Sequence, residues 1–281
     1  MSGLGSVAGL WRYPVKSMQG EPLDAAHATE RGFLGDRVYA LIDSATEKVV
    51  SAKHPKKWPG ILEWRARFLG TPAPDSIPAV RVQFPDGSAI SSDDAGFNAR
   101  VSNAFQRDVV LRSIPPEKLV LEEYWPDIEG LAHRETVTDE TFSLGTSSGT
   151  FFDFSAIHLL TKSTLGTLER AYPAGCFDLR RFRPNILLEG APDGLPENDW
   201  VGKKIAIGDQ VVLKVLIPCP RCVMTTLPQG ELPLDSGILK TAARENNALI
   251  APLNQKMPSI GVYAKVVRGG DVRHGDSARL V

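Results

Sequence analysis

The chain has 281 residues, of which 42% are hydrophobic, and its formal net charge at pH 7 is −1. That length and apolar content suffice for the core of one large domain or two modest ones. The near-balanced charge excludes a global field that would attract nucleic acid or an acidic membrane, so any anion site must be local.

The sequence shows no features of a membrane-spanning or secreted protein. No run of about eighteen apolar residues occurs, and the first ten residues have neither the basic nor the apolar region of a signal peptide. The three cysteines, an odd number, are poor material for a disulfide framework. We therefore expect a cytoplasmic protein in a reducing compartment, without nucleic-acid or membrane partners.

Short β-branched or alternating runs, separated by turn residues, dominate the chain. They predict strands at residues 38–42, 80–84, 109–112, 186–188, 211–216 and 262–267. Helical periodicity predicts helices at 95–106 and 162–171, the second capped by Thr161 or Ser163, and a third candidate at 236–246. The composition changes over residues 113–149. We predict an α+β, β-rich fold with a mixed β domain at residues 1–115 and a second domain at 116–281.

A cysteine pair, Cys219 and Cys222, follows the predicted strand at 211–216. A zinc site would need four ligands, and the histidines show no paired ligand spacing. A thioredoxin-like site would need a helix after the first cysteine, whereas residues 223–230 predict extended chain and a turn. Two structural cysteines at a strand end remain an alternative. Arg221 favours a functional thiolate, because a cation beside Cys222 stabilises the charged form.

Two further groups of cations could bind an anion. Arg180, Arg181 and Arg183 precede Asn185, and guanidinium groups offer planar forks of donors to phosphate. A solvated basic turn explains them equally well. Earlier in the chain, a polar turn carries Lys16-Ser17, with Arg37 further along. This turn lacks the glycine-rich approach and the helix of a nucleotide-binding loop.

These segments together resemble one family. LWRYPVKSMQG at residues 10–20, with GDR at 35–37, resembles the N-terminal β-rich domain that precedes MOSC domains. RFRPNI at residues 181–186, and PRC at 220–222 followed by two threonines, resemble the signatures of the MOSC domain itself. The family includes the mitochondrial amidoxime-reducing components and the C-terminal domain of molybdenum cofactor sulfurase. The resemblance implies a MOSC β-barrel with a few helices at residues 116–281.

The resemblance also implies a cofactor, a molybdenum ion held by molybdopterin, with Cys222 as the protein ligand of the metal and the catalytic residue. The positions that match cofactor contacts in the family are Lys16, Ser17, Arg37, Ser155, Arg183, Asn185, Arg221 and Tyr263. If one bound phosphate is met by all of these segments, the turn at Lys16 must face Arg183 and Cys222 across a preformed cavity.

The implied activity is the reduction of small N-hydroxylated substrates. Some members carry a ferredoxin-like domain or a membrane anchor that is absent from these 281 residues. We therefore expect electrons from a separate ferredoxin-like or cytochrome b5-like protein with its reductase. Two alternatives stay open: a carrier of sulfur or of the molybdenum cofactor without turnover, and a metal-free module that binds a phosphorylated partner.

Overall fold

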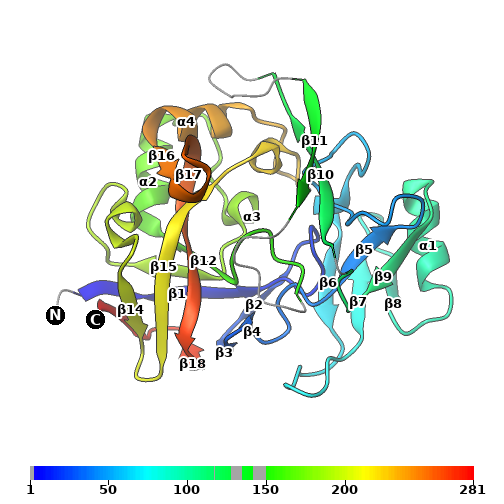
Figure 1. Cartoon of the computed structure of the whole chain (residues 1–281), viewed down its shortest axis with the longest axis horizontal. Coiled ribbons are helices and arrows are strands. Elements are labelled where there is room, and N and C mark those ends of the chain that lie inside the picture. The colour runs from blue at the N-terminus through cyan, green and yellow to red at the C-terminus, as the bar shows by residue number, and fades with distance from the viewer. Residues whose placement is uncertain (1–2, 117, 128–134, 142–149) are drawn as a thin grey trace.

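The computed structural model describes residues 3–116, 118–127, 135–141 and 150–281. Within these residues, seven strands close into a barrel, because the strand at one end of the main sheet also pairs with one near the other end. Around the barrel they run β12 (Ile157–Thr161), β13 (Ile186–Glu189), β1 (Gly3–Arg12), β19 (Ser277–Leu280), β14 (Lys204–Ile207), β15 (Val211–Pro220) and β17 (Gln255–Arg268) (Figure 1). The short strands β2 (Glu21–Leu23) and β16 (Asn247–Ile250) add to this sheet.

Alternating burial explains why these strands curl around one core. Along β15, Val211, Leu213 and Val215 are buried while the residues between them are partly exposed. Side chains from the first strand and from the second half of the chain fill the interior, including Val7, Leu10, Ile157 and Val262. The first strand therefore belongs to the barrel, which sequence patterning did not predict.

A second core lies beside the barrel. It is built from β5 (Ala40–Asp43), η1 (Ile61–Glu63), β6 (Arg65–Phe68), β7 (Val80–Gln83), β8 (Ala89–Ser91), α1 (Phe97–Phe105) and β9 (Val109–Arg112). Trp64 stacks on Phe105 with ring centroids 4.5 Å apart and meets Phe84 edge-on at 4.7 Å. Met224 and Leu227, from far along the chain, also pack against this core. Their packing brings the segment after Cys222 to the second core.

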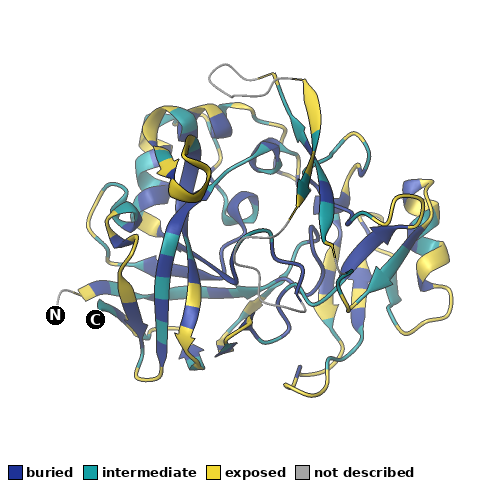
Figure 2. Ribbon diagram, in the orientation of Figure 1, coloured by how far each residue is buried: buried dark blue, intermediate teal, exposed yellow. Residues whose placement is uncertain are grey.

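The remaining elements cover the barrel or bridge the two cores (Figures 1 and 2). The covering elements are α2 (Lys162–Ala171), α3 (Leu179–Phe182), α4 (Gly237–Glu245), η2 (Pro196–Trp200), η3 (Val223–Thr226) and η4 (Ala251–Leu253). A small sheet is formed by β18 (Gly270–Arg273), β3 (Ala25–Thr29) and β4 (Gly32–Phe33), and β10 (Val120–Trp125) pairs with β11 (Thr136–Thr141) as a hairpin. Among the described helices, none is long and apolar enough to cross a membrane.

The β-rich α+β fold is confirmed, as are the three helices and five of the six predicted strands within a few residues; the strand predicted at 262–267 lies inside the longer β17. Thr161 caps α2 by accepting a hydrogen bond from the Thr164 amide. The extended chain predicted from residue 223 is wrong, because the first four residues form η3. The boundary near residue 115 stays a prediction; parts of the 113–149 segment lie outside the described residues.

Candidate functional site

A cavity of about 400 Å³ opens where the barrel, the second core and the hairpin β10–β11 meet. Its lining comes from segments far apart in sequence. Of the residues predicted for a site, seven line it: Lys16, Ser17, Arg37, Arg183, Arg221, Cys222 and Tyr263. The structure thus brings the Lys16 turn, the Arg183 loop and the Cys222 loop to one cavity, as the sequence predicted.

The inner end of the cavity is cationic. The guanidinium groups of Arg37 and Arg183 both lie over the Tyr13 ring, at 4.7 and 4.3 Å from its centroid. Burial, followed by repulsion from Arg37, lowers the pKa of Arg183 to about 10, so this side chain is still charged at neutral pH. Burial opposes the charge on Arg37, but Asp36, whose Oδ2 lies 2.5 Å from Nη1, raises the pKa of Arg37 above its usual value.

The backbone at this end adopts an uncommon conformation. Ser17, Arg37 and Arg183 have φ values of 67°, 49° and 57°, in the left-handed region that side chains with a Cβ seldom occupy. Such strain persists only where the surroundings impose it, and it concentrates at functional sites. Of the seven described non-glycine residues with positive φ, these three line the cavity.

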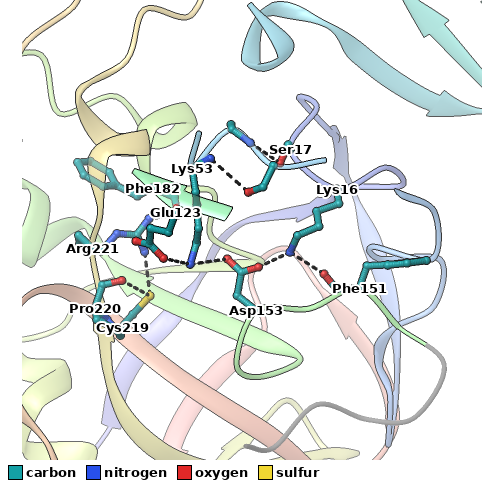
Figure 3. Close-up of polar contacts among 12 residues, drawn as sticks. Lys16, Ser17, Lys53, Glu123, Phe151, Asp153, Phe182, Cys219, Pro220 and Arg221 are labelled. Carbon is teal, nitrogen blue, oxygen red and sulfur yellow. Dashed lines mark hydrogen bonds and ion pairs between the residues drawn. The ribbon is translucent and has the colours of Figure 1, made fainter. Parts of the chain in front are cut away.

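A ladder of alternating charges crosses the cavity (Figure 3). Lys16 pairs with Asp153 and donates to the Phe151 carbonyl at 2.8 Å, and Lys53 lies 3.6 Å from Asp153 and 2.8 Å from Glu123. Burial lowers the pKa of Lys16 despite its carboxylate partner. Burial alone would raise the pKa of Asp153, but the two lysines hold it far below its usual range. The two lysines and two carboxylates balance one another; Lys16 and Glu123 are buried, and Lys53 and Asp153 are partly exposed.

The two cysteines differ in environment. Cys219 is fully buried, and its Sγ accepts a hydrogen bond from Nη1 of Arg221 at 2.8 Å. Cys222 is partly exposed and lines the cavity. Burial, then the charge of Glu123, raises the pKa of the Cys222 thiol to about 12. Arg221 acts in the expected direction, but desolvation outweighs it.

Two predicted residues serve the framework around the cavity. Ser155 is buried and donates to the Ala264 carbonyl at 2.7 Å. The amide of Asn185 donates to the Trp11 carbonyl and to Asp36, and its oxygen accepts from the His158 amide at 3.1 Å. These bonds tie β1 and β12 together beneath the cationic end. Neither residue is part of the cavity lining.

The three arginines of residues 180–183 have separate environments. Arg180 is partly exposed and pairs with Asp178 and Glu231, each at 2.8 Å. Arg181 is fully buried, and its guanidinium donates to four backbone carbonyls, from Cys176, Thr225, Leu227 and Pro233. Only Arg183, which follows the last turn of α3 in the left-handed conformation, reaches the cavity.

Sequence reasoning missed several lining residues, among them Lys53, Glu123 and Asp153. No local motif marks Lys53 or Glu123, since their importance comes from a pairing 70 residues apart. Phe154 stacks on Tyr263 with centroids 5.8 Å apart, and both line the cavity. Among the described residues, no group of three His, Cys, Asp or Glu side chains could hold a metal ion.

The chain matches two families: the MOSC N-terminal beta barrel domain over residues 4–72 and the MOSC domain over residues 146–279. It is similar to mitochondrial amidoxime reducing component 2 of Rattus norvegicus, at 24% identity over 97% of this chain and 82% of the relative. Mitochondrial amidoxime-reducing component 1 of Homo sapiens is 25% identical over 99% and 83%. A solved structure, the YUAD protein from Bacillus subtilis, matches with a TM-score of 0.44 and 12% identity over 98% and 93%.

Proposed function

The chain belongs to the MOSC domain proteins, with a MOSC N-terminal β-barrel domain ahead of the MOSC domain, and we propose that it binds a molybdenum cofactor in the cavity and reduces N-hydroxylated compounds. Relatives named as amidoxime reducing components support the reaction class. The observation that carries the proposal is the convergence of Lys16, Arg37, Arg183 and the Cys222 thiol on one cavity.

The residues present fit such a group. A phosphate is matched by fixed guanidinium forks and an ammonium, which bind it through charge-assisted hydrogen bonds. A thiol suits a soft metal better than an oxygen ligand would. Within the described part of the chain, the buried Nε of Arg221 has no hydrogen-bond partner. A buried donor left without an acceptor is costly, so a ligand that accepts from Arg221 would satisfy it.

Different residues of the cavity would bind different parts of the cofactor. Arg37 and Arg183, fixed over Tyr13, would hold the anionic end, and Lys16, whose charge is shared with Asp153, lies beside them in the turn after β1. Cys222 is the residue that would hold the metal, and its thiol would bind as the thiolate, because coordination deprotonates a thiol whatever its pKa in the free protein. Arg221 and Tyr263 line the same cavity as Cys222 and would set the polarity around a group bound there.

When bound, the cofactor supplies two-electron chemistry that removes the oxygen of an N-hydroxyl group. The whole reaction consumes two electrons and two protons and yields the amine or amidine and water. The chain's own part is to orient the substrate and to hold charge in place. A separate ferredoxin-like or cytochrome b5-like protein, with its reductase, supplies the electrons.

The test uses the full chain purified from bacteria that make the cofactor. Benzamidoxime is offered with a reduced viologen as the chemical electron donor, and benzamidine is measured. We expect turnover from this protein and none from the same protein made in a cofactor-deficient host. Bound molybdenum without any benzamidine would contradict the reductase proposal and favour a cofactor carrier. Absence of molybdenum would favour a metal-free anion-binding module.

A further inference from the structure

The short helix α3 contacts the loop that carries Cys222 on both sides of that residue. On the side before Cys222, Nη2 of Arg221 donates to the Phe182 carbonyl at 2.9 Å. On the side after it, Nη1 of Arg181 donates to the Thr225 carbonyl at 3.1 Å. Phe182 and Arg181 both belong to α3. This helix therefore holds the loop before and after the residue to which the metal is assigned.

Arg181 directs most of its hydrogen bonds to the segment after Cys222. Besides the Thr225 carbonyl, Nη1 reaches the Leu227 carbonyl at 3.1 Å, and Nη2 donates to the Pro233 carbonyl at 2.8 Å. The first two carbonyls lie at the end of η3, where backbone acceptors lack partners within the helix and a nearby cation is favourable. The planar fork of a guanidinium can meet several such acceptors at once, which the compact ammonium of a lysine cannot.

The Arg181 side chain is buried and makes no ion pair with any of the described residues. Its burial lowers its pKa, and keeping a charge in such a place is costly unless hydrogen bonds compensate it. Four of its five N–H groups have such partners, since Nε also donates to the Cys176 carbonyl at 3.0 Å. Any shift of this guanidinium would break several of these bonds, so the loop is held in one arrangement.

A single residue, Thr225, connects Arg181 to Cys222. The Thr225 amide and hydroxyl both donate to the Cys222 carbonyl, at 3.2 and 3.0 Å. Met224 and Leu227 pack against the second core, so η3 contacts that core as well as α3. Cys222 is the residue immediately before η3. Its backbone is therefore fixed relative to α3 through Thr225 and Arg181.

We propose that Arg181 is a positioning residue, which sets the place of the Cys222 sulfur relative to the Arg183 guanidinium. Arg183 follows α3 directly and lines the cavity together with Cys222. A ligand bound by a sulfur at one point and by a guanidinium at another needs the two groups at a fixed separation. The part of this inference that concerns the metal rests on the proposed function, whereas the link from Arg181 to Cys222 belongs to the chain itself.

The first test uses the full chain from a host unable to make molybdopterin. The exposed Cys176 is replaced by serine in every variant, iodoacetamide is added, and mass spectrometry follows the alkylation of Cys222. We expect Arg181→Lys to raise the rate at Cys222 about tenfold, because losing one or two hydrogen bonds favours local opening of the loop. Arg180→Lys is the matched control, because it makes the same change in the neighbouring side chain, whose ion pairs lie outside the cavity.

The second test uses the same variants from a cofactor-producing host and measures pterin content and thiolate-to-metal absorption. We expect Arg181→Lys to retain pterin, since Arg37 and Arg183 are unchanged, but to show altered thiolate-to-metal absorption. Thr225→Val, which removes the hydroxyl bond to the Cys222 carbonyl, should alter the absorption in the same direction, and Thr225→Ser should keep the wild-type spectrum. A lower melting temperature of Arg181→Lys with a wild-type spectrum would show a purely structural role and overturn the assignment.

Equal alkylation rates of Cys222 in the wild type and Arg181→Lys would also overturn the assignment, as would equal increases in Arg181→Lys and Arg180→Lys. Thermal unfolding shows whether each variant is folded. If Arg181→Lys does not fold, Thr225→Val decides by the same two measurements. A wild-type protein that binds no molybdenum would refute the proposed function, and the alkylation rates in the cofactor-free protein would then decide the positioning role by themselves.

Discussion

Arg221 places its Nη1 atom 2.8 Å from the sulfur of Cys219, the cysteine that does not line the cavity. A second bond, from Nη2 to the Phe182 carbonyl at 2.9 Å, fixes the guanidinium between α3 and β15. Arg221, although it precedes Cys222 in sequence, thus fixes this loop by its hydrogen bond to Cys219. The two sulfurs therefore have different tasks, one in the framework and one facing the ligand.

Replacing each cysteine in turn separates these tasks. We expect Cys222→Ser to lose molybdenum or its thiolate-to-metal absorption with little change in melting temperature, since serine offers a harder oxygen. Cys219→Ser should keep the metal and lose about 1–2 kcal/mol of stability, because it puts a smaller, more polar group in a buried position. Metal content, visible spectra and chemical denaturation are measured on both. The reverse pattern would show that the ligand is misassigned.

Replacing Arg183 with alanine is expected to weaken cofactor binding, whereas replacing Arg180 with alanine is not. Arg183→Ala removes a buried guanidinium from the cationic end, and the loss of charge-assisted contacts to a phosphate costs about 1.5–3 kcal/mol. Arg180→Ala removes a partly exposed side chain that pairs with Asp178 and Glu231 outside the cavity. Cofactor retained after gel filtration is compared between the two. Equal retention would disprove the role given to Arg183.

Acid should destabilise the protein through His158. Burial, followed by repulsion from Arg221, lowers the pKa of this buried imidazole from 6.5 to about 3. Below pH 6.5 the His158 imidazole becomes protonated in the unfolded chain but stays neutral in the folded chain. The free energy of unfolding is therefore highest above pH 6.5 and decreases as the pH falls. Between pH 6.5 and pH 5 the loss from this group is about 1.5 kcal/mol.

Chemical denaturation across this range, with His158→Gln as the comparison, isolates the contribution. Glutamine keeps a donor for the Ile260 carbonyl, which the imidazole Nε2 meets at 3.1 Å, and does not titrate. We expect the pH dependence of the free energy of unfolding to be shallower in this variant. Identical pH profiles in the two proteins would mean that His158 is not the group responsible.

Two glycines with positive φ should respond differently to alanine. At Gly261, with φ of 72°, a Cβ would lie 2.6 Å from both the His158 Nε2 atom and the Leu159 carbonyl oxygen, so backbone must move. At Gly230, with φ of 62°, a Cβ meets nothing within 4 Å. We expect Gly230→Ala to cost about 1 kcal/mol from conformation alone and Gly261→Ala about 3 kcal/mol. Similar costs in denaturant titrations would contradict the steric account.

The sequence was most informative where local chemistry decides the outcome. Alternating burial made β15 predictable, and a threonine before a periodic segment made the start of α2 predictable. The strand β1 was missed because three glycines weaken its local signal and its pairing with β13 and β19 spans nearly the whole chain.

The residues of the candidate site were likewise predictable where a short motif marks them and unpredictable where tertiary packing brings them together. The family signatures pointed to Lys16, Arg183 and Cys222, and the structure brings these to one cavity. What separates Arg183 from Arg181 is the left-handed residue after a four-residue helix, which no spacing rule reveals. The pairing of Lys53 with Glu123 depends on how the hairpin docks on the second core, so it could be found only in three dimensions.

Molybdenum content is the most direct test of the central claim, that the cavity holds a molybdenum cofactor. The full chain is purified in parallel from a cofactor-producing host and from one unable to make molybdopterin, and metal and released pterin are measured by mass spectrometry. The account predicts close to stoichiometric molybdenum and pterin in the first preparation, little of either in the second, and loss of both in Arg183→Ala. A wild-type protein from the producing host that contains neither would contradict it.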